Sequence, residues 1–333
     1  MNSSASRVLV TGACGSVGSA LVQRLLDEDH VVCAFDQSED GLFRLDQEFK
    51  DRGRDRLRLF VGNVRDEIRL RRAMEGVAIV FHCAALKHVY LSEYNPFEAM
   101  QTNIVGTNNI IQAAIAAGVE RVVFTSSDKA VNPTSTMGAT KLLGERLFIA
   151  ACLHAGSHKT RFACVRFGNV LNSNGSVLQI FKRQLANSLP LTITSTAMTR
   201  YFISMSQAVE LCLSVSARMV GGEIFVMNMG SCDILTLAKV INGDRPFQFV
   251  VIGNKPGEKL YEELVTESEA PRTVFDGNSY VILPDILDMM PKEVRVCYAS
   301  YDKFPKLTKP LRSDENLLST AEVFSMLNLA NLI

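Results

Sequence analysis

Features that are absent from this 333-residue sequence exclude several classes of protein before any motif is considered. It has 35 lysine and arginine residues and 35 aspartate and glutamate residues, so no excess charge favours binding to nucleic acid or to a membrane surface. No run of about 18 apolar residues occurs, which predicts that no helix spans a membrane. Residues 1–7 lack the apolar core of a signal peptide, so we expect a cytoplasmic protein.

The eight cysteines include no Cys-x-x-Cys pair, and most lie in apolar runs such as residues 31–35. This pattern indicates buried thiols in a reducing compartment, and we predict no bound metal. The sequence also contains no internal repeat, no low-complexity segment and no linker rich in serine, glycine and proline.

The first half of the chain does contain a regular alternation of apolar runs and helical patterns. It predicts strands at residues 7–11, 31–35, 57–61, 77–82, 121–125 and 162–167, and helices at 16–29, 94–118 and 138–156. Continuous apolar strands that alternate with helices are typical of a parallel sheet covered on both faces. We therefore predict the α/β class, with a Rossmann doubly wound parallel sheet and right-handed crossovers.

A glycine-rich loop joins the first predicted strand to the first helix. Gly12, Gly15 and Gly18 have the spacing G-x-x-G-x-x-G, and Ser16 and Val17 begin the helix. The glycines permit a tight turn and a close approach of the backbone to a pyrophosphate, and the helix N-terminus supplies free N–H groups. The loop therefore predicts a dinucleotide site.

Asp36 follows the second strand, where a carboxylate accepts hydrogen bonds from a ribose 2′-hydroxyl and repels a 2′-phosphate. The next residues, 37–40, carry no positive charge. Both observations favour NAD over NADP. We assign residues 1–170 to an NAD-binding domain and residues 171–333 to a smaller mixed substrate-binding lobe, because short elements at 191–194, 206–219, 223–227, 235–241 and 247–252 replace the regular alternation. Segments of the two parts are expected to interleave at one cleft.

Side chains able to transfer protons gather after the strand at residues 121–125. Ser127, Asp128 and Lys129 follow it directly, and Lys141 lies near the start of the next helix. A hydroxyl, an acid and two amines near a dinucleotide site indicate redox chemistry combined with proton transfer. Met137 stands four residues before Lys141, where a dehydrogenase of this type usually has a tyrosine.

Several stretches resemble those of one enzyme family. They are 82–89 (HCAALKHV), 102–107 (TNIVGT), 127–133 (SDKAVNP), 166–170 (RFGNV), 198–202 (MTRYF) and 255–260 (KPGEKL). Together with the glycine spacing, they resemble the extended short-chain dehydrogenase/reductases, and among these the UDP-N-acetylglucosamine 4,6-dehydratases of polysaccharide biosynthesis. Met137 resembles the branch that carries methionine in place of the catalytic tyrosine and retains configuration at C5. Asn63, in place of a more usual aspartate, and Asn172-Ser173-Asn174 depart from the family pattern.

The resemblance implies a reaction and a set of site residues. C4 of the sugar is oxidised with NAD, water is eliminated across C5–C6, and the hydride returns to C6. The implied catalytic residues are Ser127, which bonds the 4-hydroxyl, Asp128 as acid, Lys129 as base, Lys141 and Met137. The proton of the 4-hydroxyl leaves through Asp128, Lys129, a water or Lys141. The expected cofactor contacts are Gly12, Gly15, Ser16, Val17, Gly18, Asp36, Gln37, Ser38, Asn63, Val64, Ala84, Ala85, Asn103, Ser126 and Lys141. The expected substrate contacts are Lys87, His88, Asn169, Ser176, Arg200 and Glu258.

Two other functions are compatible with the same residues. A nucleotide-sugar epimerase or 5,6-dehydratase would share the fold and cofactor, and an inactive NAD-binding sensor would account for the missing tyrosine. The partner is expected to be a nucleotide sugar, with UDP or GDP left open. By resemblance, the helices at 94–118 and 138–156 form a homodimer interface through apolar side chains: Ile104, Ile110, Ile111, Ala114, Leu142, Leu143, Leu147 and Ile149.

Overall fold

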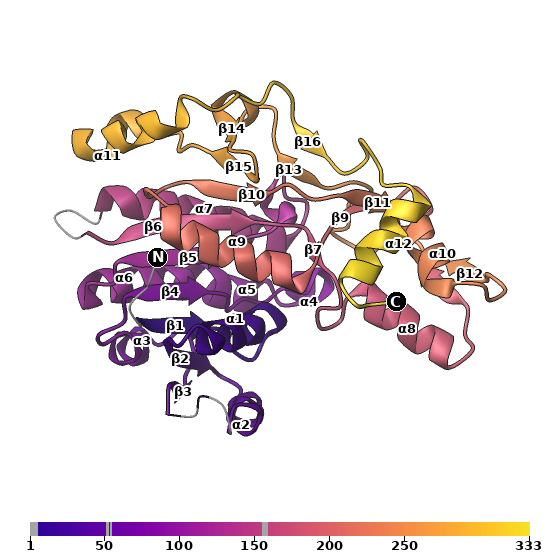
Figure 1. Cartoon of the computed structure of the whole chain (residues 1–333), viewed down its shortest axis with the longest axis horizontal. Helices are drawn as coiled ribbons and strands as arrows, with labels where there is room; N and C mark the ends of the chain where they lie inside the picture. The colour runs from indigo at the N-terminus through magenta and orange to yellow at the C-terminus, as the bar shows by residue number, and fades with distance from the viewer. Residues whose placement is uncertain (1–5, 51–52, 54, 155–158) are drawn as a thin grey trace.

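A nine-stranded sheet forms the main part of the computed structural model, which describes residues 6–50, 53, 55–154 and 159–333 (Figure 1). The strand order is β14-β15-β10-β6-β5-β4-β1-β2-β3. Neighbours from β3 to β10 pair in parallel, and β15 and β14 are antiparallel additions at one edge. The bounds are β1 (Arg7–Thr11), β2 (Val31–Asp36), β3 (Leu57–Val61), β4 (Ile79–His82), β5 (Arg121–Thr125), β6 (Arg161–Arg166), β10 (Ile224–Met227), β14 (Thr273–Phe275) and β15 (Ser279–Ile282). The predicted Rossmann α/β fold is confirmed.

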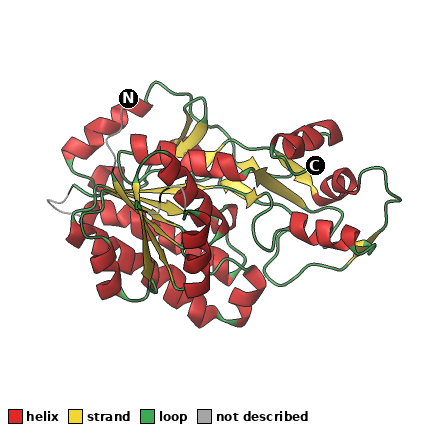
Figure 2. Ribbon diagram, turned by 60° about the horizontal axis from the view of Figure 1, so that its bottom comes forward, coloured by secondary structure: helices red, strands yellow, loops and turns green. Residues whose placement is uncertain are grey.

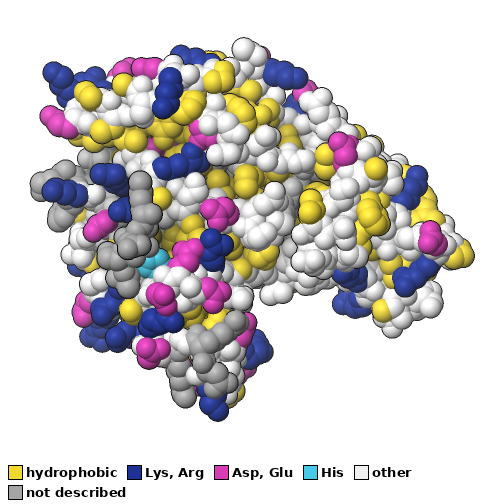
Figure 3. Space-filling view, in the orientation of Figure 1, with side chains coloured by type: hydrophobic (Ala, Val, Ile, Leu, Met, Phe, Trp, Pro, Cys, Tyr) yellow, Lys and Arg dark blue, Asp and Glu magenta, His cyan; other side chains and the backbone are white. Residues whose placement is uncertain are grey.

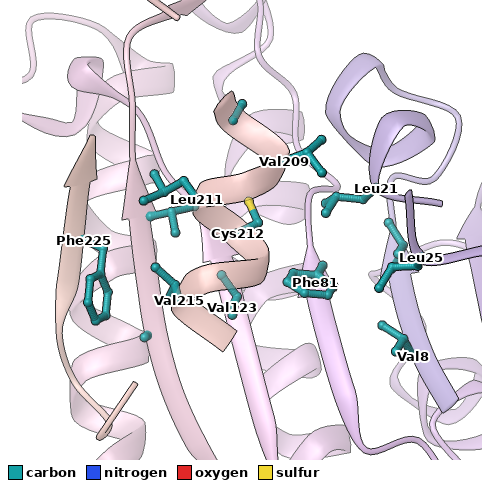
Figure 4. Close-up of a cluster of buried hydrophobic side chains, with 14 of the residues drawn as sticks. Val8, Leu21, Leu25, Phe81, Val123, Val209, Leu211, Cys212, Val215 and Phe225 are labelled. Carbon is teal, nitrogen blue, oxygen red and sulfur yellow. The ribbon is translucent and has the colours of Figure 1, made fainter. Parts of the chain in front are cut away.

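Helices cover both faces of this sheet (Figure 2). One face packs against α1 (Ser16–Asp27), α2 (Glu39–Glu48) and α9 (Met205–Arg218), and the other against α3 (Glu67–Ala73), α6 (Gly106–Ala117) and α7 (Thr136–His154). Successive strand side chains point to opposite faces, so a strand covered on both sides must be apolar throughout. Figure 4 shows one such layer, in which strand residues Val8, Phe81, Val123 and Phe225 meet side chains of α1 and α9.

A second part with its own core lies beside the carboxyl ends of the strands (Figure 1). Its helices are α8 (Val177–Ala186), α10 (Ile234–Asn242) and α12 (Thr320–Leu329), and its short strands are β7 (Asn169–Val170), β8 (Leu191–Ile193), β9 (Thr199–Ile203), β11 (Ser231–Asp233) and β12 (Phe249–Val251). The pair β13 (Glu263–Val265) and β16 (Leu311–Arg312) lies between the parts, and α11 (Lys292–Cys297) follows β15. Because β10, β14 and β15 belong to the main sheet, the chain returns to it after residue 170, and the proposed division at that residue stays a prediction.

The helix expected over residues 94–118 is not one regular α-helix, and that prediction is wrong in two respects. Tyr94 ends a separate helix, α4 (Val89–Tyr94), and α5 (Pro96–Met100) begins at a proline, whose missing N–H is tolerated in a first turn. A π-helical turn, Gln101–Val105, then joins α5 to α6.

The surface carries charges of both signs, which are interspersed over the face in Figure 3. Within the described residues, no helix is both long enough and apolar enough to cross a membrane. Four of the apolar residues expected at a dimer interface, Ile110, Ile111, Ala114 and Ile149, are instead buried in this chain's own core. A homodimer stays a prediction. The large apolar side chains that remain exposed on α4, α5 and α7 are Tyr90, Leu91, Tyr94, Phe97 and Leu143.

A buried ion cluster joins the sheet to α7 and to the segment after β13. Arg166, at the end of β6, is 1% exposed, and its guanidinium donates to both carboxylate oxygens of Glu145 at 3.0 and 2.7 Å. It also donates to both oxygens of Glu269 at 3.1 Å and to the Leu264 carbonyl at 2.7 Å. Burial alone would raise the pKa of Glu269, but the charge and hydrogen bonds of Arg166 lower it to about 2. Glu269 is therefore ionised near neutral pH beside the Arg166 guanidinium.

We predict that Arg166→Met destabilises the protein by about 3–5 kcal/mol, because two carboxylates are left buried without their cation. Urea unfolding measures this change. The control is Arg71→Met, which removes an exposed pair with Glu67 on α3 and should have a much smaller effect. Equal changes in the two variants would contradict the prediction.

Candidate active site

A cleft of about 740 Å³ lies at the carboxyl ends of the parallel strands, between the sheet and the smaller part. Ligands bind at this edge in doubly wound sheets, at the point where the strand order reverses, which here lies between β1 and β4. Most residues expected at the site line this cleft: Gly12, Gly15, Ser16, Val17, Gly18, Asp36, Gln37, Asn63, Val64, Ala84, Ala85, Lys87, His88, Ser126, Ser127, Lys129, Met137, Lys141, Asn169, Ser176, Arg200 and Glu258. Ser38, Asn103 and Asp128 are not among its lining residues.

The glycine-rich loop leaves room for a pyrophosphate. Gly12 has φ +68°, and a Cβ there would lie 2.7 Å from the Ala84 nitrogen. A Cβ on Gly18 would overlap the Gly12 carbonyl. No side chain caps the first N–H groups of α1, which begins at Ser16 beside the cleft. The loop therefore fits a dinucleotide phosphate.

The adenosine end of the cleft contains a fixed carboxylate. Asp36 accepts hydrogen bonds from the backbone nitrogens of Cys14 at 3.0 Å and of Ser38 at 2.9 Å. The Asn63 side chain donates to Gln37 at 3.0 Å. The Ser38 hydroxyl accepts from the Gly41 nitrogen and caps α2, which explains why Ser38 does not face the cleft. Asp36, Gln37 and Asn63 provide hydrogen-bond acceptors for a ribose hydroxyl. None of the three carries a positive charge that would stabilise a 2′-phosphate.

Asn103 positions other residues. It lies in the π-helical turn, is 2% exposed, and bonds both the nitrogen (2.8 Å) and the oxygen (3.0 Å) of Leu86. Its amide also donates to the Thr140 hydroxyl at 2.9 Å. These three bonds tie the loop after β4 to α7 at the residue next to Lys141. Its expected cofactor contact stays a prediction.

Lys141 occupies an apolar environment. Its amine donates to the Thr125 carbonyl at 2.8 Å and lies 4.6 Å from the centroid of the Phe124 ring. Burial lowers the pKa of the Lys141 amine to about 8, which places its titration near physiological pH. Met137 lies one turn earlier on the same helix and is 3% exposed. This side chain cannot transfer a proton.

Ser127, Asp128 and Lys129 form a hydrogen-bonded cluster at the end of β5. The Ser127 hydroxyl donates to Asp128 Oδ1 at 2.7 Å, and the Lys129 amine donates to the same oxygen at 3.0 Å. Lys129 also donates to Asn169 Oδ1 at 3.2 Å. Burial opposes the charge of Lys129, but the Asp128 and Glu262 carboxylates outweigh that effect and raise the pKa of its amine. The two lysines are therefore placed in opposite electrostatic environments.

Two charged residues of this cleft, Lys259 and Glu262, were missed by the sequence analysis. Glu262 Oε1 lies 3.7 Å from the Lys129 amine, and Glu262 Oε2 lies 3.9 Å from the Lys259 amine. The only available signal was their position, because Lys259 belongs to the stretch 255–260 and Glu262 follows it closely. The contact of Glu262 with Lys129 depends on how the segment before β13 packs.

Arg200 bonds mainly to backbone carbonyls, and its expected substrate contact stays a prediction. Its terminal nitrogens donate to the backbone carbonyls of Thr199 at 2.7 Å and Lys259 at 2.9 Å. Its Nε lies 3.7 Å from Glu262. Arg200 lines the cleft, and its hydrogen bonds to the Lys259 and Leu260 carbonyls hold the segment that carries Lys259.

Residues 172–176 of the smaller part contact the glycine-rich loop and the loop after β4. Lys87 donates to the Asn174 carbonyl at 2.8 Å, and the Asn174 nitrogen donates to the Ser16 hydroxyl at 3.0 Å. The buried hydroxyls of Ser126 and Ser176 line the cleft and have no hydrogen-bond partner among the described residues. Such groups usually have a partner, so both fit contacts to a bound ligand. The part of the chain that is described contains no group of histidine, cysteine and carboxylate side chains suited to a metal ion.

Comparison with known proteins agrees with this architecture. The family model described as "Polysaccharide biosynthesis protein" matches residues 8–284. The chain is 44% identical over 305 residues to "Uncharacterized membrane protein MJ1061" of Methanocaldococcus jannaschii, covering 89% of this chain and 90% of that protein. It is 39% identical over 282 residues to "UDP-N-acetylglucosamine 4,6-dehydratase (inverting)" of Campylobacter jejuni, covering 84% and 83%.

A solved structure, that of Pen from Bacillus thuringiensis, superposes with a TM-score of 0.90 at 36% identity and covers 98% of each chain. The matched segment includes the glycine-rich loop, the Ser127–Lys129 cluster and Lys141. The chain therefore belongs to the polysaccharide biosynthesis protein family, and its fold is that of the extended short-chain dehydrogenase/reductases.

Proposed function

We propose that the protein is an NAD-dependent 4,6-dehydratase that converts UDP-N-acetylglucosamine, or a closely related UDP-N-acetylhexosamine, to its 4-keto-6-deoxy product. The observation that carries this proposal is one cleft that joins a dinucleotide-binding loop to the Ser127, Lys129 and Lys141 side chains. The relative of 39% identity named for this activity supports the choice of substrate. Met137 supports retention of configuration at C5, since it resembles the methionine branch.

Each step has a residue suited to it. When bound, NAD supplies the chemistry that takes a hydride from C4 and returns it to C6. Ser127 bonds the 4-oxygen, and Lys129 in its neutral form removes the C5 proton, which the 4-ketone makes acidic. A carboxyl group of the same cluster protonates the departing 6-hydroxyl; the resemblance assigns this role to Asp128.

The proton of the 4-hydroxyl needs an acceptor, because Met137 has none to offer. We assign this role to Lys141, directly or through a water. Burial lowers the pKa of its amine to about 8, and the helix that carries Lys141 also carries Met137. Lys129, with its pKa raised by two carboxylates, is less suited to this first step.

The function is tested by incubating the purified protein with UDP-N-acetylglucosamine in D2O. We expect a product that is lighter by the mass of water and carries deuterium at C5. Lys129→Ala should lose C5 deuteration by about 10²–10⁴-fold and keep its NAD, because it removes a base and not a cofactor contact. Mass spectrometry and the absorbance of released cofactor measure both quantities.

Other outcomes would contradict the dehydratase in different ways. An epimerase would change configuration at C4 without loss of water, and an inactive sensor would bind NAD and leave the sugar unchanged. Near-normal turnover of Lys129→Ala would refute the role of that lysine.

The cofactor preference gives a second prediction. Protein stripped of cofactor should recover activity with NAD better than with NADP, because Asp36 repels a 2′-phosphate and the cleft residues beside it carry no cation. Titration of activity against each cofactor measures the preference. Equal or better recovery with NADP would contradict it.

The missing tyrosine gives a third prediction. Met137→Tyr should leave turnover unchanged or lower, because the proton path already uses Lys141 and a phenol adds bulk that needs a polar partner. In both proteins the rate of C4 oxidation should increase as the pH rises through about 8, since the Lys141 amine must lose its proton to act as a base. A rise in turnover of tenfold or more, about 1.4 kcal/mol of barrier, would show that the chain is a decayed tyrosine-type enzyme.

A further inference from the structure

Glu262 is a buried residue of the cleft to which the resemblance assigns no role. It is 2% exposed and lines the cleft beside Lys129. Its backbone is held on both sides by buried Ser313, since the Glu262 nitrogen donates to the Ser313 hydroxyl at 2.8 Å and the Ser313 nitrogen donates to the Glu262 carbonyl at 2.8 Å. The side chain therefore starts from a fixed position.

The carboxyl group itself is not held by hydrogen bonds. The amine of Lys129 and Nε of Arg200 both lie 3.7 Å from Oε1, and the Lys259 amine lies 3.9 Å from Oε2. These separations exceed hydrogen-bond distance. The shorter bonds of the two outer cations go elsewhere, with Arg200 donating to backbone carbonyls and Lys259 donating to the Val131 carbonyl at 2.7 Å.

Glu262 Oε2 has no hydrogen-bond partner among the described residues. A buried carboxyl oxygen without a donor is costly unless the group is protonated or meets a ligand. Because this carboxyl lines the cleft, a bound sugar is within the space it faces.

Asp128 also has a buried oxygen, Oδ2, without a hydrogen-bond partner among the described residues, but it differs from Glu262 in where it lies. It is 0% exposed and does not line the cleft, and its Oδ1 accepts hydrogen bonds from both Ser127 and Lys129. Those bonds orient the hydroxyl and the amine that do face the cleft. Asp128 is placed to position its neighbours, whereas Glu262 is placed to meet the substrate.

We propose that Glu262, and not Asp128, is the acid that protonates the departing 6-hydroxyl. The proposal rests on the dehydratase function proposed above. Glu262 and Lys129 are neighbours in the cleft, so a base for C5 and an acid for O6 lie side by side, as elimination across the C5–C6 bond requires. Asp128 is then a positioning residue.

The protons balance over the elimination. Neutral Lys129 takes the C5 proton and becomes an ammonium, the C5–H electrons form the C5–C6 double bond, and the C6–O bond breaks. The oxygen leaves as water with the proton of Glu262, which becomes a carboxylate. When the hydride returns to C6, the electrons of the C5–C6 double bond take up a proton at C5 from the Lys129 ammonium. The proton that Lys141 took from the 4-hydroxyl then passes through water to the Glu262 carboxylate, which restores all three groups.

The electrostatics of Glu262 agree with an acid. Burial raises the pKa of its carboxyl, and the Asp128 charge adds to that effect, together outweighing Lys129, Arg200 and Lys259. General acids that act near neutral pH commonly have such raised values.

The test compares two leaving groups. Fluoride departs without needing a full proton transfer, so 6-deoxy-6-fluoro-UDP-N-acetylglucosamine should bypass a missing acid. With Glu262→Gln, we expect water loss from UDP-N-acetylglucosamine to fall about 10²–10⁴-fold and fluoride release from the analogue to fall less than about tenfold. Asp128→Asn should slow both leaving groups alike, because it misplaces Ser127 and Lys129.

The matched control is Glu263→Gln, the adjacent residue on β13, whose carboxylate bonds Asn132. It should eliminate water and fluoride at wild-type rates. Bound NAD and formation of NADH with substrate report that each variant is folded and oxidises C4, and Glu262→Asp should recover part of the water loss because it restores an acid.

Three results would overturn the assignment. They are equal losses of water and fluoride in Glu262→Gln, wild-type water loss in that variant, and selective fluoride rescue of Asp128→Asn. Wild-type protein that releases neither water nor fluoride would instead contradict the dehydratase function and, with it, this assignment.

Discussion

The arrangement of the cleft depends on the buried ion cluster of Arg166, Glu145 and Glu269. A buried guanidinium requires full compensation, and this one receives carboxylates from α7 and from the segment after β13. Glu145 lies one turn after Lys141, and Leu264, whose carbonyl Arg166 also binds, follows Glu262 closely. One side chain of the sheet therefore fixes two of the elements that bring titratable side chains to the cleft, α7 with Lys141 and the β13 segment with Glu262.

A second constraint acts at the edge of the sheet. The parallel strands β1, β4 and β5 end together, so the glycine-rich loop, the loop after β4 and the Ser127–Lys129 cluster meet without any long connection. The π-helical turn joins the loop after β4 to α7 at this edge, because it directs Asn103 into hydrogen bonds with Leu86 and Thr140. Such turns are frequent at functional sites.

The two lysines show how one cleft can shift the pKa of the same residue type in opposite directions. Lys141 lies against Phe124 and a single carbonyl, so its pKa is lowered to about 8 by burial. Lys129 lies between the carboxyl groups of Asp128 and Glu262, which raise its pKa despite burial. Environment, and not residue type, separates the pKa values of the two lysines, and the proposed proton path without a tyrosine at position 137 depends on this separation.

The sequence by itself determined the first six strands of the sheet and the cofactor loop. Strands at 7–11, 57–61 and 121–125 were predicted with the observed bounds, because continuous apolar runs and glycine spacing are local signals. Only the tertiary structure decided which polar side chains face the cleft. Asp128 turns inward, Arg200 binds backbone, and Glu262 arrives from far along the chain, because each orientation depends on long-range packing and charge compensation. The π-helical turn was missed for the same reason, since Asn103 finds its partners on two other segments.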